Sequence, residues 1–381
     1  MKLVIQGLRE EVWGTIREEY REDTVIEDLH TIHPCTGCFS CWNRTPGQCV
    51  IKDGYDQFGR EIHHADQVVV LSEYAYGGFS GFVKNVFDRC LGYVLPQFEV
   101  IHGETHHQKR YPEDKPFTFI FYGHNLSEEE KLSARKYVRA VCANIRGFVK
   151  QVEFRELPGS ASHRATAEIT GSPKALLLNA SVRFEKGNSA KLGNQLLQGM
   201  RKEYECVPLI RMMDHPEDLL ERLCGVSDLV LLTPLYVDGL PSQLIRFMQY
   251  AEHSYAGGAK RVYVLANMGL YESRQLENLF SQVRQWCAKM GFEYCGGAGI
   301  SAGELVGGLM DLFPFGTWPT KSAAKSLSAL RKAIDEGEKI DELYAEPDGF
   351  PRSLYLWIAN TGWNKAARRN GISPKDLYRK L

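Results

Sequence analysis

The sequence predicts an α/β protein built from two doubly wound parallel sheets in tandem. Short apolar runs that suit buried strands alternate with segments of helical periodicity along both halves of the 381-residue chain. A polar stretch rich in small residues interrupts this alternation at 157–173. Because strands that alternate with helices form parallel sheets covered on both faces, we expect domains at 1–156 and 174–340. Residues 341–381 should form a C-terminal helical extension.

Each half offers five candidate strands. In the first half they are expected at 2–8, 23–30, 67–71, 117–122 and 149–154. Helices are expected between them, at 9–20, 56–64, 80–91 and 127–146. The segment 94–113, rich in His and Pro, is expected to be a loop or a partner-facing excursion.

The second half repeats the pattern. Its strands are expected at 174–179, 204–210, 229–232, 261–266 and 292–300, with a closing helix at 323–336. Asp228 lies 162 positions after Asp66, and the same shift places Tyr74 on Tyr236. This agreement predicts an internal duplication of one unit. The glycine-rich run 296–308 fits no phosphate pattern and is expected to be a site of close packing.

Composition limits the function classes. A hydrophobic content of 44% and a charged content of 24% are typical of a globular protein, and a net charge of -1 gives no general field for nucleic acid or acidic membrane. We see no signal peptide and no membrane-spanning run, so a cytoplasmic location is expected. In a reducing compartment the ten cysteines should be thiols or ligands rather than disulfides.

The most informative stretch runs from Lys174 to Gln198, where a strand, a polar loop and a helix follow one another directly. Asn188 or Ser189 is the expected N-cap. Free N–H groups and the positive end of the helix dipole would then face the loop, as in sites that hold a phosphate. An ordinary polar strand-to-helix connection is the alternative. The expected phosphate-binding residues are Ser181, Val182, Arg183, Asn188 and Ser189.

Two further loops should lie beside this one. Open α/β sheets bind ligands at the carboxyl ends of strands, where the strand order reverses. With the flavodoxin-like strand order 2-1-3-4-5 this point lies between the first and third strands, so the loops after the third and fourth strands of the second half complete the candidate site. Their expected contributors are Thr233, Pro234, Leu235, Tyr236, Asn267, Met268 and Gly269.

These loops resemble those of a known family. The pattern N-A-S-x-R-x-x-x-G-N-S-x-x-L, from Asn179 to Leu192, resembles the phosphate loop of NADPH-dependent FMN reductases and iron–sulfur flavoproteins, with Ala180 where the family has Gly. T-P-x-Y, from Thr233, resembles their flavin-bordering loop. The resemblance implies a flavodoxin-like fold with strand order 2-1-3-4-5, bound FMN and NAD(P)H-linked oxidoreductase activity. A small-molecule acceptor or an electron-carrier protein would be the partner, and the flavin itself would carry the redox chemistry.

Four cysteines form C-x2-C-x2-C-x7-C in the first half, at Cys35, Cys38, Cys41 and Cys49. Such compact spacing suits a [4Fe–4S] cluster better than zinc, which usually takes two separated pairs. The sequence leaves three alternatives open for these cysteines: an iron–sulfur cluster, a structural zinc ion, or plain thiols. The arrangement resembles the iron–sulfur flavoprotein motif, although that family carries its cysteines and its flavin loop in one unit.

The first half has no Ser/Gly/Asn loop after its first strand, so we expect it to bind no second FMN and to act as an intrachain partner of the second half. Further association into a homo-oligomer is left open. Two other functions are also open, a redox-silent interaction protein whose four clustered cysteines bind a structural zinc ion, and a pure electron carrier.

Overall fold

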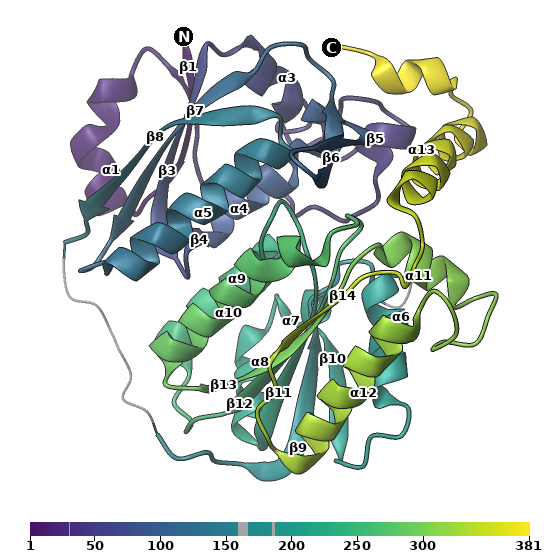
Figure 1. The fold of residues 1–381 in the computed structure, drawn as a ribbon. Coiled ribbons are helices and arrows are strands. Elements are labelled where there is room, and N and C mark those ends of the chain that lie inside the picture. The colour runs from purple at the N-terminus through teal and green to yellow at the C-terminus, as the bar shows by residue number, and fades with distance from the viewer. Residues whose placement is uncertain (30, 159–166, 185–186) are drawn as a thin grey trace. The chain divides into compact units, whose positions relative to one another are not determined.

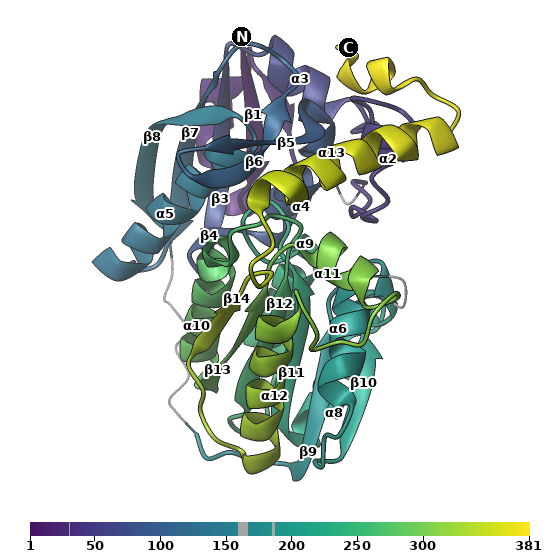
Figure 2. The ribbon, with the colours of Figure 1, turned by 45° about the vertical axis from the view of Figure 1, so that its right-hand side comes forward.

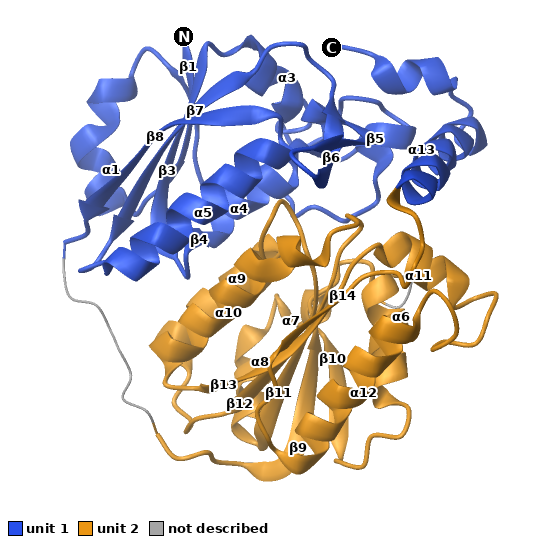
Figure 3. Ribbon diagram, in the orientation of Figure 1, with its two compact units in different colours: residues 1–161, 353–381 blue, residues 162–352 orange. Residues whose placement is uncertain are grey.

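The computed structural model describes residues 1–29, 31–158, 167–184 and 187–381. It divides into two compact units, Met1–Ala161 with Ser353–Leu381, and Ser162–Arg352 (Figure 3). The expected C-terminal extension is thus split, since all of it beyond Arg352 belongs to the first unit. Of the expected linker, residues 159–166 lie outside the described ranges.

The first unit is organised around a parallel sheet in the order β2-β1-β3-β7-β8 (Figure 1). Taken in chain order, the five parallel strands have the arrangement 2-1-3-4-5, as predicted, which is that of flavodoxin-like folds. A two-residue strand, β4, pairs antiparallel with β3. The strands are β1 (Lys2–Gly7), β2 (Thr24–Ile26), β3 (Gln67–Ala75), β4 (Gly78–Phe79), β7 (Lys115–Gly123) and β8 (Gly147–Glu156).

Helices cover both faces of this sheet. On one face, Val12 and Trp13 of α1 pack in a buried cluster with Val69 of β3. On the other face, the ring of Phe79 stacks on Phe87 of α4 and meets Tyr137 of α5 edge-on. The helices are α1 (Glu10–Ile16), η1 (Arg17–Tyr20), α2 (Ser40–Asn43), α3 (Phe58–His64), α4 (Gly81–Asp88), η2 (Cys90–Tyr93), α5 (Glu128–Asn144), α13 (Arg352–Arg369) and η5 (Pro374–Tyr378).

The expectation of a loop at 94–113 is wrong. The segment forms an antiparallel hairpin of β5 (Val94–Ile101) and β6 (Glu104–Lys109). His102 and Gly103 both have positive φ, as a two-residue hairpin turn requires. Pro96, which argued against a strand, lies where the register shifts between Val94 and Phe98 and therefore interrupts no regular ladder.

The second unit has a six-stranded parallel sheet in the order β10-β9-β11-β12-β13-β14. Its first five strands repeat the 2-1-3-4-5 arrangement, and β14 is an edge strand that the sequence did not predict. The shared arrangement fits a duplication, which stays a prediction. The strands are β9 (Ser172–Asn179), β10 (Tyr204–Pro208), β11 (Val226–Pro234), β12 (Arg261–Asn267), β13 (Glu293–Ile300) and β14 (Glu342–Ala345).

Both faces of the second sheet are also covered. Leu192 of α6 and Leu327 of α12 join a buried cluster on one face, and α8, α9 and α10 lie on the other (Figure 1). The helices are α6 (Asn188–Leu197), α7 (Leu209–Met212), α8 (Pro216–Cys224), α9 (Ser242–Ser254), η4 (Ser273–Leu276), α10 (Glu277–Met290), α11 (Gly303–Leu309) and α12 (Lys321–Glu336). Within the described ranges, no helix is both long enough and apolar enough to cross a membrane.

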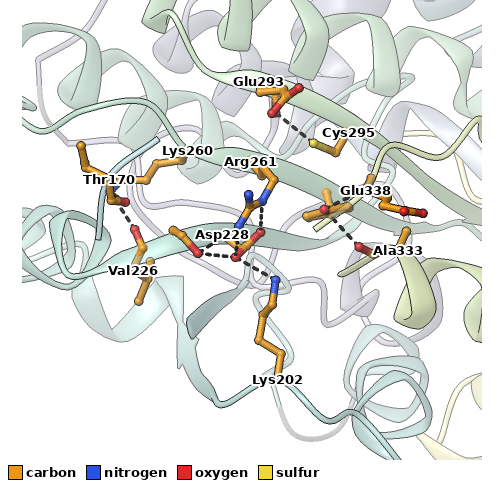
Figure 4. Close-up of polar contacts among 12 residues, drawn as sticks. Thr170, Lys202, Val226, Asp228, Lys260, Arg261, Glu293, Cys295, Ala333 and Glu338 are labelled. Carbon is orange, nitrogen blue, oxygen red and sulfur yellow. Dashed lines mark hydrogen bonds and ion pairs between the residues drawn. The ribbon is translucent and has the colours of Figure 1, made fainter. Parts of the chain in front are cut away.

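Buried ion pairs fix the amino-terminal edge of this second sheet (Figure 4). Asp228 is fully buried and accepts hydrogen bonds from Arg261 Nε at 2.7 Å and from Lys202 Nζ at 3.0 Å. Burial raises the pKa of Asp228, but the bonds from Arg261, Ser227 and Lys202 outweigh it and hold that pKa below its ordinary value. The equivalent Asp66 of the first unit is exposed instead, with 82% of its side chain accessible.

Candidate functional site

The candidate site lies at the carboxyl ends of β9, β11 and β12, on the edge of the sheet opposite the Asp228 ion pairs. After β9 the chain continues to β10 on one side of the sheet, and after β11 it continues to β12 on the other side. The strand order therefore reverses between β9 and β11. The backbone N–H of Ala180 still donates to Leu232 O at 2.8 Å. The pairing of the two strands therefore continues up to the start of the connection between β9 and α6, which is the predicted phosphate loop.

The phosphate loop folds back on itself through its own polar groups. Ser181 N–H donates to Asn179 Oδ1 at 3.0 Å, and Arg183 N–H donates to Ser181 Oγ at 3.4 Å. Ser181 is buried, whereas Arg183 is exposed. These bonds turn the chain sharply after β9 and leave the guanidinium at the surface of the loop.

The predicted N-cap is wrong. Helix α6 begins at Asn188 with Gly187 as its N-cap, and among the described residues no side chain caps the helix. The reason is that the two polar side chains are engaged elsewhere. Ser189 Oγ donates to Asn267 Oδ1 at 2.5 Å, and the Asn188 amide lies against Gly307 of α11. The N–H groups of Ala190 and Lys191 both donate to Gly187 O, at 3.1 and 3.3 Å, whereas those of Asn188 and Ser189 precede the first intrahelical hydrogen bond and lie at the loop end of α6.

The Ser189–Asn267 bond joins the phosphate loop to the loop after β12. Both side chains are buried, at 4% and 7% exposure. The carbonyl of Asn267 accepts a hydrogen bond from Leu235 N–H at 2.8 Å, which connects the loop after β11 to the loop after β12. Met268 N–H donates to Ile300 O at 3.1 Å. Three predicted loops are thus held together at one edge by hydrogen bonds between them.

The loop after β11 is a tight turn. Tyr236 and Gly239 exchange two backbone hydrogen bonds, of 2.9 and 3.0 Å, across Val237 and Asp238, which both have positive φ. Leu235 and Tyr236 are half-buried, and so is Gly269 in the loop after β12.

Some predicted residues only support the site. Thr233 is fully buried, with its hydroxyl donating to the carbonyl of Pro234 at 3.2 Å, and Pro234 and Met268 are buried as well. Side chains so placed can shape a ligand pocket but present little surface to a ligand.

Helix α11 contributes to the site although the sequence did not predict it. Gly303 N–H donates to Met268 O at 2.7 Å, which docks the start of α11 on the loop after β12. Glu304 then lies 3.9 Å from Arg183, and Gly307 contacts Asn188. The close packing predicted for this glycine run is confirmed at Gly297, where a Cβ would come within 2.2 Å of Val264 O. The sequence signal for the helix is weak, because Glu304, Leu305 and Val306 stand between glycines.

The corresponding position of the first unit is filled by its own side chains. Glu73, at the end of β3, accepts the backbone N–H of Arg9 at 3.1 Å and its guanidinium at 2.8 and 2.9 Å. Arg9 is the N-cap of α1. A carboxylate of the chain thus lies at the start of the helix that follows the first strand of this unit.

The cysteine loop, residues 33–55, carries four free thiols. Burial raises the pKa of Cys35 to about 12 and that of Cys41 well above its ordinary value. Partial burial also acts on Cys38, but hydrogen bonds with Ser40 and Thr36 outweigh it and lower that pKa. In the part of the chain that the structure describes, no three His, Cys, Asp or Glu side chains are grouped to hold a metal ion. The metal site predicted at Cys35, Cys38, Cys41 and Cys49 therefore stays a prediction.

Known proteins resemble this chain weakly. No protein-family model matches the chain, and no curated protein matches it. Among solved structures, the Trp repressor binding protein from Bacillus subtilis is 21% identical, with 33% of this chain and 81% of that one covered and a TM-score of 0.28. An azoreductase from Bacillus anthracis str. Sterne is 15% identical, with 43% and 99% covered and a TM-score of 0.31.

A third solved structure, the NAD(P)H:quinone oxidoreductase from Methanothermobacter marburgensis, is 14% identical, with 44% and 98% covered and a TM-score of 0.29. Similarities this low say nothing about what this chain does. Its fold follows from its own strand order, 2-1-3-4-5 in both units. By that order, the chain is a tandem of two flavodoxin-like units.

Proposed function

We propose that this chain is an FMN-dependent oxidoreductase that binds one flavin, in its second unit. The observation that carries the proposal is the start of α6, which no described side chain caps, at the switch point of the sheet beside Ser181 and Arg183. Backbone N–H groups, a hydroxyl and a guanidinium together match the phosphate of a mononucleotide. The residues present fit this cofactor.

Each part of the site has a role in this proposal. Ser181, Val182, Arg183, Asn188 and Ser189 hold the phosphate, Val182 and Ser189 through their backbone N–H groups, since the Ser189 hydroxyl is bonded to Asn267. The loops after β11 and β12 border the ring and the ribityl chain, with Leu235 and Tyr236 offering apolar surface and Gly269 a close backbone approach. When bound, FMN supplies the redox chemistry, accepting electrons from NAD(P)H and passing them to a small-molecule acceptor or a carrier protein. The chain's own part is to bind and orient the flavin.

The first unit has no place for a second phosphate in this proposal. Glu73 already occupies the N-terminus of α1, and its carboxylate would repel a phosphate. We therefore expect one FMN per chain.

The test is a titration of flavin-free protein with FMN, followed by quantitation of bound flavin and of NAD(P)H oxidation. Replacing both Arg183 and Asn188 with Ala should lower FMN affinity by about a hundredfold or more, because each loses a hydrogen bond to a charged group worth about 1.5–3 kcal/mol. Arg201→Ala is the matched control, since its side chain is 73% exposed and pairs with Asp335 away from the loop. Two flavins per chain, or unchanged binding in the double variant, would contradict the proposal.

Iron and zinc analysis of anaerobically purified protein tests the predicted metal site separately. The outcome does not affect the flavin proposal, because the cysteine loop and the phosphate loop belong to different units.

A further inference from the structure

The last residues of the chain lie across the cysteine loop of the first unit. Figure 2 shows α13 beside α2 and the β5–β6 hairpin. The ring of Trp363 meets Phe39 and Trp42 edge-on, with centroids 5.6 and 5.3 Å apart. Phe39 and Trp42 stack on each other at 5.4 Å, and Trp42 is only 2% exposed. Because these two rings flank Cys41, Trp363 holds in place the part of the loop that contains it.

Two further contacts continue along the loop. Asn370 Nδ2 donates to Asn43 Oδ1 at 3.2 Å. Leu381, the last residue, lies against Gly47, where an added Cβ would come within 3.0 Å of its Cδ1. We call residues 363–381, which make all three contacts, the strap.

The strap has a firm anchor at its beginning. Asn360 accepts a hydrogen bond from Phe98 N–H at 2.8 Å and donates to Phe98 O at 3.2 Å, so its amide pairs with β5 as a neighbouring strand would. Tyr355, 2% exposed, also packs on Phe98. These contacts fix α13 at the hairpin, upstream of the strap.

The far end of the strap is held by a buried arginine. Arg110 is 3% exposed, and its Nη1 donates to the carbonyls of Leu377 and Arg379, both at 2.7 Å. Its Nε and Nη2 also donate to backbone carbonyls, Gly92 O at 2.7 Å and Val94 O at 3.3 Å. Burial lowers the pKa of Arg110 to about 10. A buried cation held by neutral acceptors recovers hydration when it is released, so this contact is easier to open than a buried ion pair.

We propose that residues 363–381 are a strap that opens and closes over the cysteine loop, with Arg110 as its latch. The closed strap holds Phe39, Trp42 and Gly47 in place around Cys41, and thereby limits access to the half-buried Cys35 and Cys41. Cys38, which is exposed with the strap closed, is reached in either state. A partner or reagent therefore reacts faster with the thiols of Cys35 and Cys41 once the strap opens.

The test compares alkylation rates of individual cysteines in full-length protein, read by mass spectrometry after iodoacetamide pulses. The variants are Arg110→Leu and Trp363→Ala, with Lys365→Ala on the exposed side of α13 as the matched control. Losing the latch bonds or the Trp363 contacts should raise labelling of Cys35 and Cys41 about tenfold or more. Cys38 should change less than about twofold, and the control variant should match the wild type.

Buried cysteines outside the strap report on folding. Cys90 in the first unit and Cys287 in the second should stay protected in every variant. A joint rise at all cysteines would show that the strap is part of the folded core rather than a cover, and would overturn the proposal. So would unchanged labelling of Cys35 and Cys41 when hydrogen exchange shows residues 363–381 released.

Discussion

Adding one methyl group to α11, at Gly307, should weaken phosphate binding without destabilising the fold. In Gly307→Ala, the new Cβ would lie 2.1 Å from Asn188 Oδ1 and 2.7 Å from its Cγ, whereas real Cβ contacts essentially never fall under 3.0 Å. The Asn188 amide must therefore move by roughly an ångström. If this amide binds the FMN phosphate, losing a hydrogen bond to a charged group costs about 1.5–3 kcal/mol, a fall in affinity of about 10- to 150-fold.

The next residue of the helix provides the control. A Cβ on Gly308 meets nothing within 4 Å, so Gly308→Ala should leave binding unchanged. Replacing Gly with Ala inside a helix favours the fold by up to about 1 kcal/mol, so neither variant should be grossly destabilised. Loss of FMN binding in Gly307→Ala would then not be a folding defect.

The assay is a fluorescence titration of each variant with FMN and with riboflavin, which lacks the phosphate. Gly307→Ala should weaken FMN binding and leave riboflavin binding nearly unchanged. Equal losses of affinity for FMN and riboflavin would show that the substitution acts on ring binding rather than on phosphate binding. Unchanged FMN affinity, or equal losses in both glycine variants, would refute the role given to Asn188.

Three other variants test electrostatics in both units. Glu304→Gln should tighten FMN binding up to about fivefold at low salt and less at high salt, because the 63% exposed carboxylate 3.9 Å from Arg183 no longer competes with the phosphate. Asp228→Asn should lower the free energy of unfolding in urea by about 3–5 kcal/mol, since Lys202 and Arg261 lose their buried partner; a loss below about 1 kcal/mol would contradict this. Partial burial raises the pKa of Asp53, but bonds from Arg89 outweigh it and bring that pKa down to about 2. Its stabilising effect is therefore present above the unfolded-state pKa of about 4 and is lost as the pH falls towards 2. Asp53→Asn should remove this part of the acid dependence, and an unchanged pH profile would argue against it.

The sheets could be predicted because their signal is local. Buried parallel strands such as β9 and β11 are continuous apolar runs. The strand order followed from the family resemblance, and it placed the loops after β9, β11 and β12 at one edge. Each of these loops comes directly after its strand, so the set could be named without coordinates.

The remaining parts depend on contacts between distant residues. Helix α11 has three glycines in seven residues, and its local propensity is poor. It forms because Gly303 and Gly307 allow it to pack closely on Met268 and Asn188. The N-cap of α6 was missed for a similar reason, since the bond from Ser189 to Asn267 joins residues 78 positions apart.

The return of Ser353–Leu381 to the first unit has a consequence for biosynthesis. Residues 1–161 leave the ribosome while the acceptors that Leu377 and Arg379 provide for Arg110 are still unmade. At about 5–20 residues per second, translation of the intervening second unit takes on the order of 10 to 40 seconds. During that interval the nascent first unit lacks both the contact of Trp363 with Trp42 and the two acceptors of Arg110 Nη1, which makes it a candidate substrate for chaperones until residues 353–381 are made.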